Sequence, residues 1–240
     1  MNKSVYFFDL YGTLTDIRTD ETMPSLWRGL ARYYSLGGAA YTSGSIRKRY
    51  EALCAEETAA LAAESGLEEE AVEIELKNVF RRLYEEKGVC VSPAQIADAA
   101  LLFRALSYRR VPRLMPGAKR TLEELRRRGA KLVLLSNAQS CFTFPELRQL
   151  GLAESFDQIF LSSDFGCKKP SPAFFRLAMA KAGAAAEESV MVGNDLEADI
   201  AGADRCGMES RYYHTRLSPP RSGKLPDSCR EIAALTDLTE

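Results

Sequence analysis

Short apolar runs alternate with helical patterns along most of the chain. The runs are rich in β-branched and aromatic residues and predict buried strands at residues 5–10, 132–135, 159–161, 190–192 and 211–213. Apolar residues at helical spacing predict helices at 119–128, 145–150, 173–182 and 196–206, and glycine follows several of them, as helix C-termini prefer. This alternation predicts an α/β fold: a Rossmann-like parallel sheet with helices on both faces.

Residues 16–110 follow a different pattern, because they show no convincing strand and repeat apolar residues at helical spacing. The repeated positions are Ile46, Tyr50, Leu53 and Leu61; Val72, Leu76, Val79, Phe80 and Leu83; and Ile96, Ala99, Phe103 and Leu106. We expect an α-helical bundle cap at 16–110, inserted into a core domain formed by 1–15 and 111–240. An insertion after the first strand is expected above the carboxyl ends of the strands, where open α/β sheets bind ligands.

Composition narrows the class of protein. The chain has 240 residues, 46% hydrophobic and 27% charged, so it can bury a core without disulfides or structural metals. Lys plus Arg number 32 against 33 Asp plus Glu, and this balance gives no electrostatic motive for binding nucleic acid or an acidic membrane. The six cysteines form no C-x-x-C pair and are expected to be reduced. We expect a cytoplasmic monomer or homodimer that acts on a small-molecule substrate, with no signal peptide or membrane helix.

The histidine count of one restricts the chemistry further. Zinc sites with several histidines are excluded, and a Ser-His-Asp or Cys-His mechanism would depend on His214 alone. His214 follows the last strand-like run, which favours a structural or exposed position. The chemistry is therefore expected to use carboxylates, hydroxyls, amides and cations.

Polar side chains stand at the ends of the predicted strands. These residues are Asp9, Gly12 and Thr13 after the first strand; Ser136 and Asn137 after the second; Lys169 before a proline and a helix; and Asn194, Asp195 and Asp199 after the fourth. A carboxylate at the end of a buried strand is costly unless a charged group pairs with it. Each residue alone has an ordinary alternative, such as turn capping for Asp9, a surface position for Lys169 and helix N-capping for Asp195.

Together, in this order and at these strand ends, the segments resemble the haloacid dehalogenase-like (HAD) hydrolase superfamily over nearly the whole chain. The helical insertion is similar to that superfamily's C1 cap. The resemblance favours a Mg²⁺-dependent phosphatase of a small phosphorylated metabolite. The match identifies the superfamily more strongly than it identifies the reaction.

The resemblance also implies roles for the matching residues. Asp9 would be the nucleophile that forms an aspartyl-phosphate, and Lys169 would pair with it and with the transferring group. Thr13 and Ser136, with Asn137 beside it, would bind the phosphoryl oxygens. Mg²⁺ would be held by the Asp9 carboxylate, the Tyr11 backbone carbonyl, and the loop residues Asn194, Asp195 and Asp199.

Two positions depart from the family's phosphatases. Tyr11 stands where a second aspartate usually protonates the leaving group, and a phenol with a pKa of about 10 is a poor replacement near neutral pH. Asn194 stands where an aspartate usually follows the glycine, so Asp195 is a candidate for the direct metal contact.

Tyr11 and the Trp27–Arg28 pair point partway toward the metal-independent 2-haloacid dehalogenases, in which a cap arginine receives the substrate. Arg28 is therefore a candidate substrate contact, with an ordinary cap-helix cation as the alternative. Phe175 and Asn194 depart from that subfamily's pattern. Because no residue obviously protonates a leaving group, a weakly active protein that binds a phosphorylated ligand is a third hypothesis.

Overall fold

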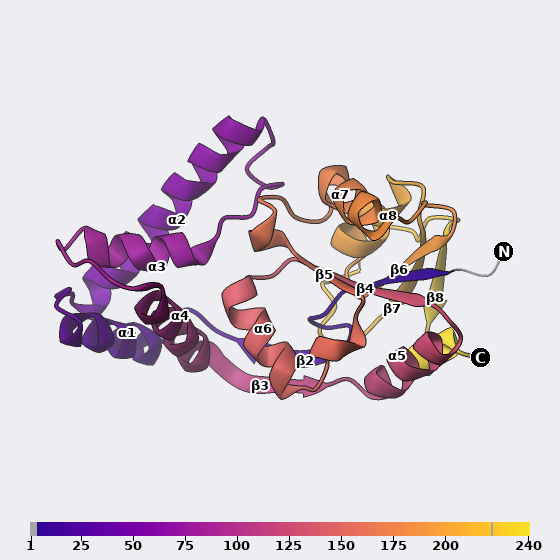
Figure 1. The fold of residues 1–240 in the computed structure, drawn as a ribbon, viewed down its shortest axis with the longest axis horizontal. Helices are drawn as coiled ribbons and strands as arrows, with labels where there is room; N and C mark the ends of the chain where they lie inside the picture. Colours follow the sequence, from indigo (N-terminus) through magenta and orange to yellow (C-terminus); the bar gives the residue numbers. More distant parts are fainter. Residues whose placement is uncertain (1–3, 222) are drawn as a thin grey trace.

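The computed structural model describes residues 4–221 and 223–240, and within them a six-stranded parallel sheet forms the centre of the core (Figure 1). In spatial order its strands are β5 (Gln158–Leu161), β4 (Lys131–Ser136), β1 (Val5–Phe8), β6 (Ser189–Gly193), β7 (Glu209–Tyr213) and β8 (Cys229–Ile232). The predicted strands and the α/β class are confirmed. The edge strand β8 was not predicted, because its two central residues are exposed and charged and it has no apolar run.

Helices cover both faces of this sheet (Figure 1). On one face α5 (Ala118–Arg127) and α6 (Ser140–Gln149) pack against Phe8 and Leu134. On the other, α7 (Pro172–Ala182) and α8 (Gly202–Asp204) pack against Phe7 and Val133. Neighbouring residues of one strand thus face opposite layers, as the pleat requires.

Two predicted helices differ in detail. Helix α6 begins at Ser140, before its predicted start, and Pro145 lies inside it. The predicted helix at 196–206 is a π-helix, η3 (Leu196–Ala201), that continues into α8. Short 3₁₀ segments occur at η1 (Ala153–Ser155), η2 (Ser162–Asp164) and η4 (Leu235–Leu238).

A second layer of helices packs around its own apolar core. Its members are α1 (Pro24–Leu36), α2 (Ser43–Ser65), α3 (Leu76–Glu85) and α4 (Pro93–Ser107). Trp27, Tyr50, Phe80 and Phe103 contact one another through their rings at the centre, with ring centroids 5.2–6.0 Å apart. The helical character expected of the insertion is confirmed, and Figure 1 shows it extending away from the sheet. None of the helices in the described part of the chain is long and apolar enough to span a membrane.

The expectation that 16–110 contains no strand was wrong. An antiparallel ribbon of β2 (Thr15–Thr19) and β3 (Tyr108–Leu114) joins the cap helices to the core. The sequences TDIRT and YRRVPRL carry too many charged residues for an apolar alternation to be visible. Backbone pairing and the ion pairs of Asp16 with Arg110 and Arg113 hold the ribbon instead.

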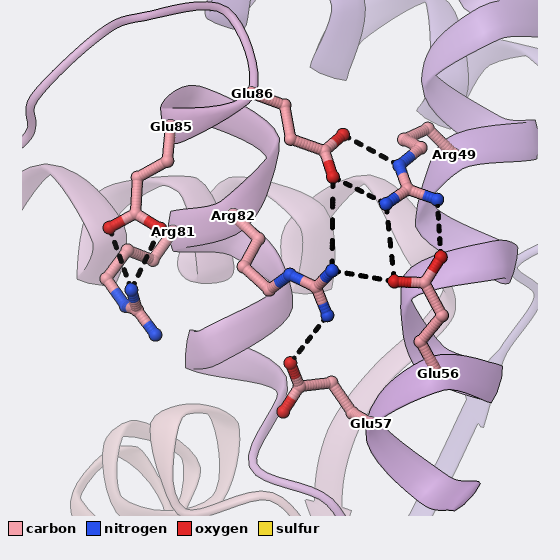
Figure 2. Close-up of polar contacts among 7 residues, drawn as sticks. All are labelled: Arg49, Glu56, Glu57, Arg81, Arg82, Glu85 and Glu86. Atoms are coloured by element: carbon pink, nitrogen blue, oxygen red, sulfur yellow. Dashed lines mark hydrogen bonds and ion pairs between the residues drawn. The ribbon is translucent and has the colours of Figure 1, made fainter. Parts of the chain in front are cut away.

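An ion-pair network joins α2 to α3 on the surface of the cap (Figure 2). The guanidinium of Arg49 contacts both Glu56, at 2.7 Å, and Glu86. Arg82 donates to Glu56 at 2.6 Å and to Glu57 at 2.8 Å. Single exposed pairs contribute little, but shared carboxylates in a network fix the relative position of two helices more effectively.

The cap also contacts the core beside the carboxyl ends of the strands. The backbone of Ala71 accepts a hydrogen bond from Lys168 at 2.9 Å, and Glu73 donates to Gly166 at 3.2 Å. Gln139, just before α6, accepts a hydrogen bond from the Leu76 backbone at 2.9 Å. Residues 71–76 therefore rest on loops that follow β4 and β5, next to the end of the sheet where a ligand is expected.

Candidate active site

A pocket of about 200 Å³ opens at the carboxyl ends of the central strands β4, β1 and β6. The chain runs from β1 to β4 and β5 on one side and returns to β6 on the other, so the connections diverge at this point. Ligands bind at such switch points in open α/β sheets. The pocket is lined by Asp9, Tyr11, Ser136, Asn137, Lys169, Asn194, Asp195, Ala198, Asp199, Leu217 and Pro219.

Asp9 follows β1 directly and is 7% exposed. One carboxylate oxygen, Oδ1, accepts from the Lys169 ammonium at 2.8 Å and from the Ser136 hydroxyl at 3.2 Å. The other, Oδ2, accepts from the Thr13 hydroxyl at 3.1 Å. A buried carboxylate requires charged and hydroxyl donors of this kind to replace the water that burial removes.

Lys169 lies between two carboxylates, at 2.8 Å from Asp9 and 2.6 Å from Asp199. Burial lowers the pKa of this ammonium, but Asp199 and Asp9 together more than offset the effect and raise it above its ordinary value. Lys169 therefore stays charged in an almost water-free position. A cation fixed in this way can contact a ligand that binds at Asp9 without reorganising.

Asn137 fixes the backbone that carries this lysine. Its side-chain amide donates to the Lys169 carbonyl at 2.8 Å, and its side-chain oxygen accepts from the Lys169 N–H at 2.8 Å. The residue was predicted as part of the catalytic group, and its contacts are those of a side chain that positions Lys169.

Asn194, the first residue after β6, brings its side-chain oxygen to the nucleophile loop. The Thr13 hydroxyl is 3.1 Å from both Asn194 Oδ1 and Asp9 Oδ2. A hydroxyl has one proton to donate, so the Thr13 hydroxyl can donate to only one of these two oxygens at a time. The Asp9 and Asn194 oxygens therefore lie close together around a single donor. A Cβ at Gly12 would be 2.4 Å from the Asn194 amide, which means that only glycine permits this approach.

The two acidic residues Asp195 and Asp199, in the segment after β6, make different contacts. Asp195 caps η3, with Oδ1 accepting from Glu197 and Ala198, both at 2.9 Å. Asp199 has a partner on each oxygen: Lys169 at Oδ1 and the Asp195 N–H at Oδ2, 3.0 Å away. Asp195 therefore acts as a helix N-cap, as the alternative interpretation expected, and it also lines the pocket. The contacts of Asp199 favour a role in positioning Lys169 over a role as a metal ligand.

Oxygen donors suited to a hard cation meet in this pocket. Within residues 4–221 and 223–240, no group of three or more His, Cys, Asp or Glu side chains is arranged to hold a metal ion. Mg²⁺, however, is bound by one or two carboxylates together with neutral oxygens, water and substrate phosphate. The convergence of Asp9 Oδ2 and Asn194 Oδ1 on a single hydroxyl fits that donor set.

The Tyr11 phenol takes part in a buried cluster that was not predicted. It donates to the Glu146 carboxylate at 2.5 Å and lies 3.0 Å from the Thr143 hydroxyl, both on α6. Burial raises the pKa of this phenol above its ordinary value, and the Glu146 charge raises it further. Tyr11 is thus a hydrogen-bond donor committed to α6, and its proton is not available to a ligand in the pocket.

The same carboxylate links the core to the cap. Glu146 is 3% exposed and accepts from Arg104 at 2.7 Å and from Tyr108 at 2.6 Å. Arg104 lies on α4 and its guanidinium is 5.5 Å from the Tyr11 ring centroid. A buried carboxylate requires such a set of donors, so the cluster fixes α4, α6 and the nucleophile loop relative to one another.

Tyr11→Phe is expected to lower the free energy of unfolding by about 1.5–3 kcal/mol, because a hydrogen bond to a buried charged group is lost. The measurement is urea-induced unfolding followed by circular dichroism. Tyr6→Phe is the matched control, since no hydrogen bond of the Tyr6 hydroxyl is found among the residues that the structure describes. Equal stability of Tyr11→Phe and the wild type would contradict the hydrogen bond.

Arg28 is not brought to the pocket of Asp9. It lies on α1 and lines a separate pocket with Arg32 and Tyr41. Its neighbour Trp27 is 3% exposed and donates from its indole nitrogen to the Glu21 carbonyl at 2.7 Å. The Trp27–Arg28 pair therefore belongs to the cap, and the role of Arg28 as a substrate contact stays a prediction without support from this geometry.

Sequence reasoning missed the contributions of α4, α6 and the segment after β7. In the sequence, Arg104 and Glu146 are ordinary charged residues of predicted helices. In the structure they form an ion pair, as charged side chains usually must when they are buried. Ser218, 3.4 Å from the Asn194 amide, and the neighbouring Leu217 come from a loop without a motif. Arg104 could have been found as a charged residue within an apolar helical face. The loop that carries Leu217 and Ser218 has no such signal in its sequence.

Comparisons with known proteins agree with this geometry. Residues 3–207 match the family model described as haloacid dehalogenase-like hydrolase. The chain is 40% identical over 100 residues to a ribulose-1,5-bisphosphate 5-phosphatase of Halopiger xanaduensis, covering 42% of each chain. It is 36% identical over 152 residues to a phosphoserine phosphatase of Thermus thermophilus, covering 63% of this chain and 59% of the relative. The chain thus matches less than two thirds of the length of these relatives.

Solved structures share the fold over almost the whole chain. A HAD phosphatase from Thermococcus onnurineus superposes with a TM-score of 0.62 at 21% identity, covering 99% of this chain and 96% of the other. A 2-haloacid dehalogenase from Pseudomonas syringae superposes with a TM-score of 0.65 at 23% identity, covering 100% and 97%. The same architecture therefore serves both reactions, and the fold alone does not choose between them.

Proposed function

The chain belongs to the haloacid dehalogenase-like hydrolase family, and from this premise we propose that it hydrolyses a small phosphorylated metabolite through an aspartyl-phosphate. The observation that carries the proposal is the buried Asp9 carboxylate, paired with Lys169 and with the Ser136 hydroxyl at the mouth of a small pocket. Carboxylate nucleophiles form covalent intermediates of this kind in phosphoryl transfer.

In the first step an Asp9 oxygen bonds to phosphorus while the bond from phosphorus to the leaving oxygen breaks. The leaving alkoxide takes a proton from solvent water, because the Tyr11 phenol donates to Glu146, and the phosphoryl group stays on Asp9. Water then attacks the phosphorus and loses a proton to solvent, the bond from phosphorus to the Asp9 oxygen breaks, inorganic phosphate departs and the Asp9 carboxylate is restored. Lys169 and the Ser136 hydroxyl stabilise the negative charge on the phosphoryl oxygens in both steps.

Mg²⁺ completes the proposed site. Its ligands would be the Asp9 carboxylate, the Tyr11 carbonyl, Asn194 and Asp195, whereas Asp199 would orient Lys169. When bound, the cation supplies positive charge that offsets the repulsion between the anionic nucleophile and the anionic phosphate. Asp9 then supplies the attacking oxygen, and Lys169 and Ser136 bind and orient the ester.

Two facts support a small phosphate monoester as the substrate. The relatives named above are phosphatases whose names give ribulose-1,5-bisphosphate and phosphoserine as substrates. The pocket volume of about 200 Å³ is below the range of roughly 300–1,000 Å³ that drug-sized ligands occupy. A metal-independent 2-haloacid hydrolase receives less support, because Arg28 lines another pocket.

Metal dependence tests the proposal. Phosphate release from a panel of small phosphate esters is expected with Mg²⁺, and excess EDTA should reduce the rate at least about 100-fold, with recovery when Mg²⁺ is restored. The measurement is colorimetric detection of inorganic phosphate. Turnover that EDTA leaves unchanged would contradict the proposal, and chloride release from 2-chloropropionate would favour the dehalogenase. Ester binding without any turnover would favour a binding protein.

A further inference from the structure

Another pocket lies between the β2–β3 ribbon and the segment after β7. Its volume is about 580 Å³, and its lining combines an apolar wall with charged side chains. The apolar part includes Leu114, Met115 and Tyr213. The charged and titratable part is Asp16, Arg113, Arg216 and His214. Small-molecule sites typically combine a concave apolar surface with a few convergent polar groups.

The charges in this pocket are unbalanced. Asp16, only 2% exposed, accepts from Arg110 at 3.0 Å, from Arg113 at 2.7 Å and from Arg216 at 2.5 Å. Arg113 and Arg216 line the pocket and Arg110 does not, so one carboxylate faces two guanidiniums there and about one positive charge remains in the pocket. A single salt-bridge partner would have been enough to compensate Asp16.

The guanidiniums also retain unused donors. Each has five N–H groups, and toward Asp16 Arg113 uses Nε while Arg216 uses one terminal nitrogen. The side chains of Arg113 and Arg216 line the pocket and are 64% and 55% exposed, so their remaining donors are accessible to a ligand. Planar guanidinium forks match the oxygen pairs of phosphates and carboxylates.

We propose that this pocket is a binding site for a small anion that carries phosphate or carboxylate groups, separate from the pocket of Asp9. Arg113 and Arg216 bind the anion, and Asp16 holds the two guanidiniums side by side. The site shares a wall with the catalytic pocket. The Thr215 hydroxyl donates to the Gly12 carbonyl at 3.1 Å, and Leu217, next to Arg216, lines the pocket of Asp9.

The single histidine of the chain makes the proposal directly testable. His214 lines the proposed site, and its Nδ1 lies 2.8 Å from the Tyr212 hydroxyl. Because the 240 residues contain no other histidine, the spectrum holds one imidazole Cε1–H resonance, and it belongs to a residue that lines this pocket. The experiment follows this resonance by ¹H–¹³C NMR at constant pH and ionic strength, with EDTA present, during titration with inorganic phosphate and separately with malonate.

A saturable shift of the His214 resonance is expected for the wild type. Arg113→Gln/Arg216→Gln should raise the midpoint at least about tenfold, while Arg110 remains to pair with Asp16. Arg127→Gln/Arg128→Gln, at the C-terminal end of α5, removes the same charge outside the pocket and should leave the midpoint unchanged. If the double variant does not fold, the single variant Arg216→Gln, at a half-exposed position, replaces it in the experiment. It should also raise the midpoint.

The two anions distinguish the ligand chemistry. A shift with phosphate alone assigns the site to phosphorylated compounds, and a shift with malonate alone assigns it to dicarboxylates. No saturable shift with either anion would overturn the proposal. An unchanged midpoint in the Arg113/Arg216 variant, or an equal loss in the Arg127/Arg128 variant, would overturn it as well. The outcome does not depend on whether the protein is a phosphatase.

Discussion

Asp9→Asn is expected to lower kcat/KM for phosphate release by at least about 10⁴-fold. An amide oxygen is a poor nucleophile, and the variant cannot form the aspartyl-phosphate. The change is nearly isosteric, so the Lys169 ammonium keeps an acceptor at this position and Asp199 still balances its charge. The fold should therefore survive, and the loss should appear in the chemical step.

Two measurements separate this outcome from a general defect. Rapid quenching followed by mass spectrometry should find one phosphoryl group on Asp9 in the wild type and none in the variant. Asp98→Asn, an exposed acid on α4, is the matched control and should retain wild-type activity. Phosphate release by Asp9→Asn within tenfold of the wild-type rate would exclude Asp9 as the nucleophile.

The grouping of several candidate site residues could be predicted from the sequence because these residues lie at strand ends. Asp9 and Ser136 lie at the ends of buried apolar runs, and the carboxyl ends of parallel strands meet at one edge of a sheet. Lys169 and Asn194 could be placed there by their order in the chain. The structure brings these residues into hydrogen-bond contact, either directly or through Thr13.

The parts that could not be predicted depend on side chains from distant segments. Glu146 and Arg104 are 42 residues apart, and each would be unremarkable on an exposed helix. Only the packing of α4 against α6 buries them, and that packing has no signature in the local sequence. The β2–β3 ribbon was not predicted for a related reason. Ion pairs between charged side chains, not an apolar face, accompany the backbone pairing of its strands.

Tyr11 is one of the two positions at which the sequence departs from the phosphatases it resembles. An alkoxide leaving group needs a proton, whereas an aryl or acyl leaving group departs readily without one. The Tyr11 phenol donates to Glu146 and has a raised pKa, so it supplies no proton to the pocket. The wild type is therefore expected to favour aryl and acyl phosphates over alkyl phosphates.

Tyr11→Asp should raise kcat/KM on an alkyl phosphate such as β-glycerol phosphate by about 100-fold, the lower end of what general acid catalysis contributes. The rate on p-nitrophenyl phosphate should change little, because that leaving group needs no proton. Tyr11→Asn is the matched control: it loses the same hydrogen bond to Glu146 and has the same size, but it has no acidic proton. The measurement is the steady-state kcat/KM of the wild type, Tyr11→Asp and Tyr11→Asn on both esters. If the Asp and Asn variants respond alike, or if both esters respond alike, the missing acid at position 11 does not limit the reaction.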